Sequence, residues 1–494
     1  MSVNPALDKK QMSVNPALDK KQMSVNPALD KKQMSANPAL DKKQMSVKPV
    51  QDKNLMTAGS VQGKLVSFAI PIFVGNLFQQ MYNAADSLIV GNFVGSTALA
   101  AVSSTGNLVF LLIGFFDGMA SGEGVVIAHC VGAGDKERTS RAVHTAAALG
   151  LLISALMTAV GVMGTPRFLA WMGTPDNVMP EAVLYLKIYF AGAAGLVLYN
   201  TFFGILQAAG DSRHPLYYLI ISSLVNVLLD LLFIAVFHRG VDGAALATVL
   251  SQFLAAFLSL ARLMRTNSSI RVDLRRICFT KDILVRMVRI GIPSGLQNSI
   301  IGLSNVVIQS YINSFGELAM AGIGAYTKVE GFAFIPVTSF SMALTTFVSQ
   351  NLGAGEKRRV QKGVRFGTGT GIVMAAVIGA LLDIFAPQLI AAFDSTPGVI
   401  AYGAARARIV CPFFCLVAFT HLMAAILRGY GRAGVPMMVF LVCWCAVRVL
   451  IIAAGGQFIH SIKLTYWVYP ITWMLSSGSL FIYYRKEEKH LLAG

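Results

Sequence analysis

Charged and amide side chains recur inside apolar stretches of this sequence, and such residues are candidates for function. Asp86 follows Gln79 by seven residues and Tyr82 by four, which places all three on one face of a helix. Asn226 and Asp230 form an i, i+4 pair in a second apolar stretch. Carboxyl groups in apolar surroundings can load and release protons. We therefore predict a proton-coupling site at Asp86 and Asp230. The competing interpretation is that both acids only anchor packing networks.

Sodium is an alternative to the proton as the coupling ion. Oxygen atoms of Asp86, Asn226 and Asp230 would also suit sodium, because hard cations prefer oxygen ligands. No other metal site is expected, since the cysteines have no partners at ligand spacing. No cofactor is expected either. The segment Gly59–Lys64 is one residue short of a phosphate-binding loop and is followed by Leu65. The sequence thus predicts no enzyme and no ATP site.

Other ionisable residues lie in apolar stretches with less certain roles. Glu123 is an additional proton site or a residue that faces water near a helix end. Arg406 and Arg408 would favour an anionic head group if they line a cavity. Their alternative is ion pairing, with Glu330 as a partner for one of them, or extension toward an interface.

The elements that must position these residues are membrane-spanning helices. The chain of 494 residues is 55% hydrophobic and 13% charged, against roughly 25% charged in soluble proteins, and its mean hydropathy is +0.62. These values exclude an ordinary soluble enzyme and a disordered scaffold. Apolar segments long enough to cross a bilayer recur twelve times. Their expected spans are 65–91, 97–130, 142–164, 181–209, 215–237, 243–264, 287–312, 318–350, 363–386, 398–428, 434–456 and 464–484.

The twelve segments form two repeats of six. Four sequence anchors recur at an offset of 221 or 222 residues. They are Ile70-Pro71 with Ile292-Pro293, the loop 132–136 with 353–357, Thr174-Pro175 with Thr396-Pro397, and Gly210/Pro215 with Gly431/Pro436. Because six is even, both repeats have the same orientation in the membrane, as in transporters built from parallel repeats. The predicted fold class is an all-α membrane protein with twelve transmembrane helices in two six-helix lobes.

The net charge of +17 does not indicate nucleic-acid binding. The cations are concentrated in short loops on one side of the predicted spans, including 136–141, 262–289, 357–365 and 485–489. This asymmetry is the positive-inside pattern. It predicts a multi-pass protein of a bacterial cytoplasmic membrane with both termini in the cytosol.

Four regions are expected along the chain. Residues 1–55 consist of an eleven-residue repeat with proline in each copy, which predicts a disordered tail. Residues 56–264 would form the first lobe, 265–286 a basic cytosolic linker, and 287–494 the second lobe with a short cytosolic tail. An alternative role for the tail is attraction to anionic lipid, since it carries many lysines.

At this point the sequence resembles the multidrug and toxic compound extrusion (MATE) family, in particular its proton-coupled prokaryotic branch. The resemblance covers about residues 62–485. Besides the six-plus-six layout, it is carried by Ile70-Pro71, the run Tyr82–Asp86, the glycine-containing loops after the second and eighth segments, and the run 224–230.

The resemblance implies roles for further residues. It places the helix-1 acid at Asp86, with Gln79 seven residues before it, and it adds Asn226 and Asp230. It also suggests Tyr185, Asn200 and Thr248 as cavity residues. Pro71 would bend the first helix when Asp86 is protonated. The alternative for Pro71 is a static kink.

Together these observations predict a secondary active efflux transporter. It would exchange protons, or sodium, for amphipathic cationic drugs or metabolites, and it would act as a monomer in the lipid bilayer. The first alternative is a flippase for an anionic lipid-linked precursor, motivated by the intramembrane cations. The second is a membrane scaffold whose repeat tail recruits partners.

Overall fold

The structure is a computed structural model that describes residues 55–94, 96–459 and 461–493. Apart from Leu55, the predicted disordered tail lies outside the described residues. Residues 53–494 form one unit, and within it the described part is helical, without strands. Each predicted apolar segment coincides with a helix or with a run of helical pieces. This unit contains all of the features discussed below.

The first half of this unit supplies six spans. The fourth span is a pair of helices that meet at 46° around Gly192, and the fifth ends in a π-helical turn that begins directly after Asp230. The elements are α3 (Val61–Phe93), α4 (Ser96–Gly132), α5 (Lys136–Trp171), α6 (Met179–Ala191), α7 (Ala193–Ala208), α8 (Arg213–Asp230) with η1 (Leu231–Val236), and α9 (Val241–Arg265).

The second half repeats this order after a connection that contains one 3-10 turn, η2 (Leu274–Arg276). Its first helix begins at Lys281 and therefore takes up the last six residues of the predicted linker. The elements are α10 (Lys281–Asn313), α11 (Glu317–Gly353), α12 (Lys357–Ala391), α13 (Pro397–Val410) with η3 (Cys411–Phe413), α14 (Phe414–Gly429), α15 (Gly434–Phe440) with η4 (Leu441–Ala446), α16 (Val447–Phe458), and α17 (Lys463–Ala493).

Length and composition support a membrane location. Among the described residues, eight helical stretches are long and apolar enough to cross a membrane, and a ninth if the pair α6–α7 counts as one span. The three remaining helices, α4, α10 and α17, have 37, 33 and 31 residues. At 1.5 Å per residue each exceeds a hydrocarbon layer of about 30 Å.

Glycines at the predicted repeat anchors end the helices. Gly134 and Gly355 have φ values of 70° and 74° in the turns after α4 and α11. Gly210 and Gly431 have φ values of 87° and 76° in the turns after α7 and α14. Because residues with a Cβ rarely adopt this region, the repeated glycines allow the same tight turn in both halves.

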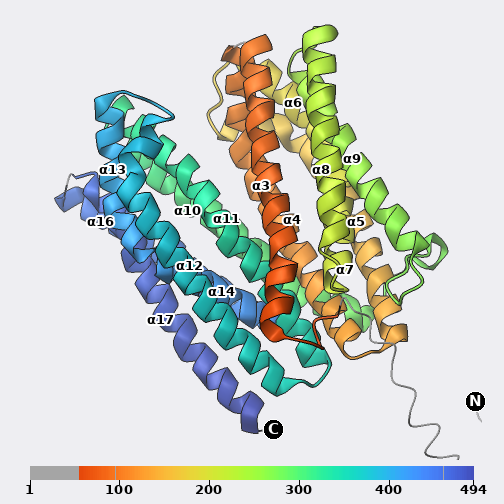
Figure 1. Cartoon of the computed structure of the whole chain (residues 1–494). Coiled ribbons are helices and arrows are strands. Elements are labelled where there is room, and N and C mark those ends of the chain that lie inside the picture. The colour runs from red at the N-terminus through yellow and green to blue at the C-terminus, as the bar shows by residue number, and fades with distance from the viewer. Residues whose placement is uncertain (1–54, 95, 460, 494) are drawn as a thin grey trace, which may run out of the picture. The chain divides into compact units, whose positions relative to one another are not determined.

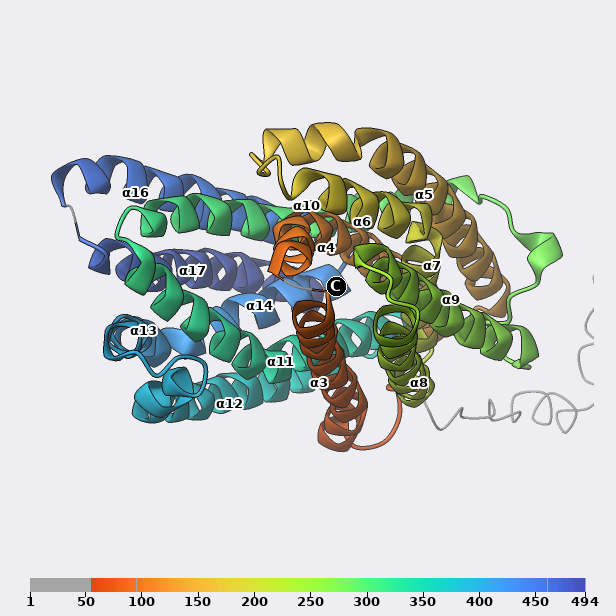
Figure 2. The same ribbon diagram turned by 90° about the horizontal axis from the view of Figure 1, so that it is seen from above.

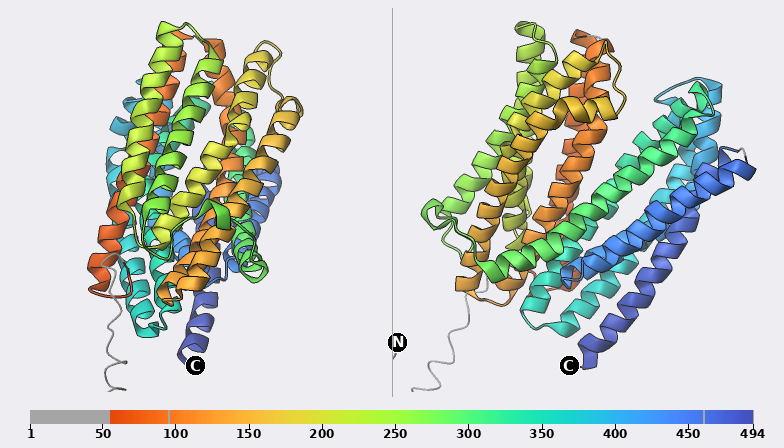
Figure 3. Two further views of the ribbon diagram at one scale, coloured as in Figure 1. Left: turned by 90° about the vertical axis from the view of Figure 1, so that its right-hand side faces the viewer. Right: turned by 180° about the vertical axis from the view of Figure 1, so that it is seen from behind.

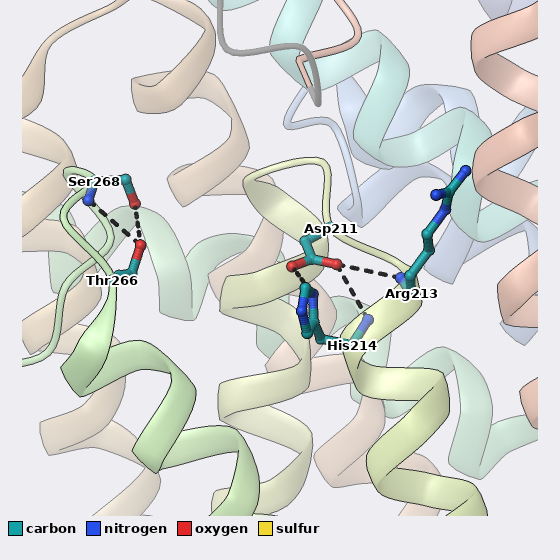
Figure 4. Close-up of polar contacts among 5 residues, drawn as sticks. All are labelled: Asp211, Arg213, His214, Thr266 and Ser268. Carbon is teal, nitrogen blue, oxygen red and sulfur yellow. Dashed lines mark hydrogen bonds and ion pairs between the residues drawn. The ribbon is translucent and has the colours of Figure 1, made fainter.

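Local hydrogen bonds fix where the chain enters and leaves these helices. In the turn before α8, Asp211 Oδ1 accepts hydrogen bonds from the backbone N–H groups of Arg213 and His214, each at 3.2 Å. Its Oδ2 pairs with His214 Nδ1 at 2.6 Å (Figure 4). Thr266, directly after α9, contacts the Ser268 hydroxyl at 3.2 Å in the same view. Short polar side chains thus define the two turns that flank the α8–α9 pair.

Two crossings join the halves. In Figure 2, the helices of the second half lie on the left and α5–α9 of the first half on the right. The remaining helices of the first half, α3 and α4, lie between these two groups. In one crossing, Gly118 and Gly122 of α4 lie against Gly295 and Gly291 of α10, so closely that a Cβ at Gly122 would be 2.4 Å from the Gly291 nitrogen. In the other crossing, α3 meets α11, where Asn76 Nδ2 donates to Ser339 Oγ at 3.0 Å.

The halves also meet end to end, and we call this contact the closed end. It joins residues 125–132 of α4 to residues 349–353 of α11, and it lies beside the turns that follow these helices (Figure 1). Ser349 Oγ donates to the Val125 carbonyl at 2.7 Å. A Cβ at Gly132 would be 1.9 Å from the backbone carbonyl oxygen of Gln350, and one at Gly353 would be 2.0 Å from the backbone carbonyl oxygen of His129. In Figure 3, the helices of the two halves diverge from this end toward the opposite one.

Candidate functional site

A cavity of about 640 Å³ lies between the two halves, within the range of volumes that hold drug-sized ligands. Six elements of the first half line it, together with α10, α11 and α14 of the second. Its polar lining from the second half consists of Gln297, Asn298, Thr338, Ser341, Thr345, Thr346, His421 and Arg428. A ligand there would contact both halves at once.

The cavity brings together most of the residues that the sequence analysis selected. Five helices separated by up to 177 residues of sequence contribute them. The selected residues that line it are Pro71, Gln79, Tyr82 and Asp86 of α3, Tyr185 of α6, Asn200 of α7, Asn226 of α8 and Thr248 of α9. Pro71 lies inside an uninterrupted α3. The Thr248 hydroxyl donates to its own helix, at the Ala244 carbonyl.

The carboxyl groups of Asp86 and Asp230 interact directly, and we call them the acidic pair. Asp230 is fully buried at the end of α8, behind the cavity wall, whereas Asp86 belongs to the lining. Neither carboxyl oxygen of Asp230 has a hydrogen-bond donor among the described residues. The Oδ1 atom of Asp86 also lacks one. A proton between the two groups would supply the missing donor.

Polar neighbours surround the acidic pair. Tyr82 interacts with Gln79 and with Asp86, and Tyr185 lies close enough to Asp86 to sense its charge. Asn226, one turn before Asp230, is 1% exposed, and neither its side-chain oxygen nor its nitrogen has a partner within the described chain. Several acceptor oxygens therefore converge without donors. Chemically, they could hold a proton or a hard cation such as sodium.

The described residues contain no group of three or more His, Cys, Asp or Glu side chains that could hold a metal ion. Among the residues selected from the sequence, Asp86, Asn226 and Asp230 offer a sodium ion a mixed set of carboxylate and amide oxygens. Carboxylate and amide oxygens are suitable ligands for that ion.

Glu123 does not face water near a helix end, which was one of the two alternatives for it. It is 2% exposed, it interacts with Thr201 of α7, and it does not belong to the cavity lining. The structure thus places it inside the first half, rather than in water near a helix end. Asp117, two turns earlier on α4, does line the cavity.

Arg406 and Arg408 lie away from the cavity, in contrast to the arrangement that would favour an anionic head group. Arg406 is 3% exposed, and its Nη2 atom lies 3.8 Å from Glu330 Oε2. Its guanidinium also stacks over Tyr326 and Tyr469, at 5.0 and 4.8 Å from the ring centres. Arg408, two residues later, is exposed on the outer side of α13. Residues i and i+2 on a helix point in different directions, which separates the two arginines.

The sequence analysis did not select several residues that line the cavity. Gln207 and Gln252 lie on helices of the first half, and Arg428 ends α14 in the second. A signal for Arg428 was present, because Gln207 and Arg428 occupy equivalent repeat positions, 221 residues apart. His421, seven residues before Arg428, contacts the rings of Phe334, Phe440 and Trp444.

Comparison with known families gives a match in both halves. The model of the MatE family matches residues 71–232 and 293–453. The two matched stretches begin 222 residues apart, so the family unit occurs twice in the register that the sequence repeat predicts. The predicted parallel repeat is confirmed.

Curated relatives match most of the chain. A probable multidrug resistance protein of Bacillus subtilis, YoeA, is 27% identical over 426 residues, which cover 85% of this chain and 92% of that protein. The probable multidrug resistance protein NorM of Thermotoga maritima is 25% identical, with 78% of this chain and 83% of that protein covered.

Solved structures share the fold. A crystal structure described as MATE in the bent conformation superposes with a TM-score of 0.84 at 22% identity, and it covers 89% of this chain and 98% of that one. The two-lobe arrangement of twelve helices is therefore confirmed.

Proposed function

Since the chain belongs to the MatE family, we propose that it is a secondary active exporter that exchanges protons for amphipathic, cationic drugs or metabolites. Its relatives named above are probable multidrug resistance proteins, which supports efflux of varied small molecules. The cavity between two repeats is where such transporters bind substrate.

The acidic pair is the observation that carries proton coupling. Two carboxyl groups side by side in apolar surroundings repel each other when both are charged, so they favour sharing one proton. Loss of that proton adds a second negative charge to the pair, at the cavity wall next to Asp86, and this charge attracts a cationic head group. Reprotonation removes the added charge and favours release of the substrate. Binding of proton and substrate would thus exclude each other, as exchange requires.

Pro71 would link the acidic pair to movement. Proline lacks the N–H group that would continue the helical ladder, so α3 is weakened about four turns before Asp86. A change in the contact between Asp86 and Asp230 can therefore bend α3 at little cost.

The first prediction tests the coupling residue. Purified protein in liposomes with an inside-acidic pH gradient and no sodium should accumulate a fluorescent cationic dye. Replacing Asp86 by Asn should abolish gradient-driven uptake, because the member of the pair that lines the cavity can then no longer gain or lose a proton. We expect Asp230→Asn to behave alike, and Asp176→Asn, on an exposed turn, to transport normally.

The same assay distinguishes the coupling ions. Full uptake by folded Asp86→Asn protein would refute the assignment. Uptake that requires a sodium gradient would instead favour sodium at Asp86, Asn226 and Asp230. The flippase alternative has less support, because Arg406 is paired inside the second half and Arg408 points away from the cavity.

We also propose a bacterial cytoplasmic membrane location with the closed end in the cytosol. The helices that begin at this end, α5 and α12, carry Arg138, Arg141, Lys357 and Arg358 near their starts, as the positive-inside rule expects on the cytosolic side. Both termini would then be cytosolic. One copy of the chain supplies the complete cavity, which supports a monomer.

A further inference from the structure

Arg428 is a cation in the cavity wall without a compensating charge. It lies in the last turn of α14, and its Nε atom is buried without a hydrogen-bond acceptor among the described residues. No ion pair involving it occurs in the described part of the chain, and no carboxylate there lies close enough to act on it. His421 is the ionisable group that senses its charge. Such a charge favours an anion.

Other enclosed arginines of the second half differ in this respect. Arg406 pairs with Glu330 and stacks on two tyrosines. Arg448 donates from Nε to Thr472 at 3.1 Å and lies over Trp444 and Tyr469. Neither lines the cavity. Arg406 and Arg448 each leave one buried nitrogen without an acceptor, but only Arg428 lines the cavity, and among the described residues it has neither a hydrogen-bond acceptor nor an ion-pair partner.

Two further donors without partners line the same part of the cavity. Gln207, the repeat equivalent of Arg428, has a buried Nε2 atom that bonds to no described residue, and the Ser341 hydroxyl is in the same situation.

Contacts with α11 bring these donors to one end of the cavity. Gly429, next to Arg428, packs against the Thr345 carbonyl and Val348. Ala208, next to Gln207, accepts a hydrogen bond from Gln350 at 2.7 Å. Both helix ends therefore lie along residues 345–350, beside the closed end.

From this geometry we propose that Arg428, Gln207 and Ser341 form an oxyanion subsite, which takes a carboxylate or phosphate group of the substrate. The inference rests on the proposed export function and refines its substrate class. The acidic pair lies in the first half and Arg428 in the second, so the cavity presents opposite charges from its two sides. Amphipathic zwitterions match both and are the preferred substrates. Charge-assisted hydrogen bonds from a guanidinium give such a site its strength.

A matched pair of dyes tests the subsite. Rhodamine 110 carries a free carboxylate, and rhodamine 123 is its methyl ester with the same cationic ring system. Equilibrium binding to the purified full-length chain is measured by fluorescence anisotropy, without any gradient. We expect the wild type to bind rhodamine 110 more tightly. Arg428→Gln should weaken rhodamine 110 binding about 10- to 100-fold and leave rhodamine 123 binding within about twofold.

Control variants separate recognition from folding. Arg428→Lys should retain part of the preference for the carboxylate, and Gln207→Leu should reduce it. Arg432→Gln removes an exposed arginine that pairs with Glu487, and it should change neither affinity. If Arg428→Gln does not fold, the preference for rhodamine 110 over rhodamine 123 is compared among the wild type, Arg428→Lys and Gln207→Leu. A preference that is not reduced in either variant refutes the subsite.

Three results would overturn the inference. Equal affinity of the wild type for the two dyes, or equal loss of both in Arg428→Gln, refutes the subsite and leaves the export function intact. Failure of the wild type to bind either dye refutes the proposed cavity function, and the subsite with it.

Discussion

At the scale of single residues, the second half shows how a buried cation is stabilised in an apolar setting. Tyr469 lies between Arg406 and Arg448, at 4.8 and 4.5 Å from the two guanidinium groups. Glu330 is the acid that acts on both. One carboxylate and three aromatic rings, those of Tyr326, Trp444 and Tyr469, thus accompany two positive charges. Loss of the carboxylate would leave both arginines without any opposite charge.

This arrangement gives a stability prediction. Replacing Glu330 by Gln should lower the free energy of unfolding by about 3 kcal/mol, because it leaves buried charge uncompensated. Thermal unfolding of the purified protein in detergent measures the change. The double variant Glu330→Gln/Arg406→Met should recover only part of it, since it removes the charge of Arg406 but leaves that of Arg448 uncompensated. Glu317→Gln, an exposed acid at the start of α11, is the control. Equal melting temperatures for Glu330→Gln and Glu317→Gln would contradict the prediction.

At the scale of elements, the two crossings between the halves are built differently. The α4–α10 crossing has glycines on both sides at i, i+4 spacing, Gly118 and Gly122 against Gly291 and Gly295, as in tightly packed transmembrane pairs. In the equivalent α3–α11 crossing, the repeat offsets of 222 for the first helix and 221 for the second put Ala69 and Phe73 opposite Ser339 and Ala343. Larger side chains keep those helices further apart. We infer that α4–α10 is the fixed crossing and that α3 is freer to move.

A valine at Gly122 tests the fixed crossing. Its Cβ would lie 2.4 Å from the Gly291 nitrogen, so α4 and α10 must separate. We expect a loss of roughly 2–3 kcal/mol of stability from overpacking and a clearly lower melting temperature. Gly369→Val is the matched control, since no atom lies within 4 Å of a Cβ at Gly369. Similar melting temperatures for the two variants would refute the role of this contact.

At the scale of the whole membrane unit, residues 53–494, the contacts of the closed end hold the two halves together. His129 and Gly132 of α4 face Gly353 and Gln350 of α11, and each residue has its repeat equivalent in the contact. Gln350 also accepts from the Met56 N–H at 2.9 Å and donates to the Ala208 carbonyl at 2.7 Å. One side chain therefore connects α11 to two segments of the first half. Alternating access would require these bonds to break.

Removing this side chain should shift the conformational equilibrium. Gln350→Ala deletes two hydrogen bonds, each worth about 1 kcal/mol, so the ratio of molecules with a separated closed end to those with a joined one should rise by up to about 30-fold. Spin labels on cysteines introduced at positions 136 and 357, in a variant without the native cysteines, would report a longer distance. Double electron–electron resonance measures this distance. Gln388→Ala, on the exposed side of α12, should leave the distance distribution unchanged. An unchanged distribution for Gln350→Ala would show that the Gln350 hydrogen bonds do not keep this end closed.

The sequence determined the spans, the repeat and the helix-ending turns of this unit. Apolar length and positive-φ glycines are local properties, and they can be read without knowing how helices pack. The candidate residues of α3 were accessible for the same reason, because spacing along one helix defines a face. The repeat offset of 221 also pairs Gln207 with Arg428, but the sequence does not show that both residues line one cavity.

Only the tertiary structure decided which polar groups meet. The contact of Asp86 with Asp230, the burial of Glu123, the pairing of Arg406 with Glu330 and the place of Arg428 in the cavity depend on how each helix is rotated about its axis. Helices that are apolar on all sides carry little sequence signal for that rotation. It is set by close packing between helices that are distant in sequence, such as the glycine contacts of α4 with α10.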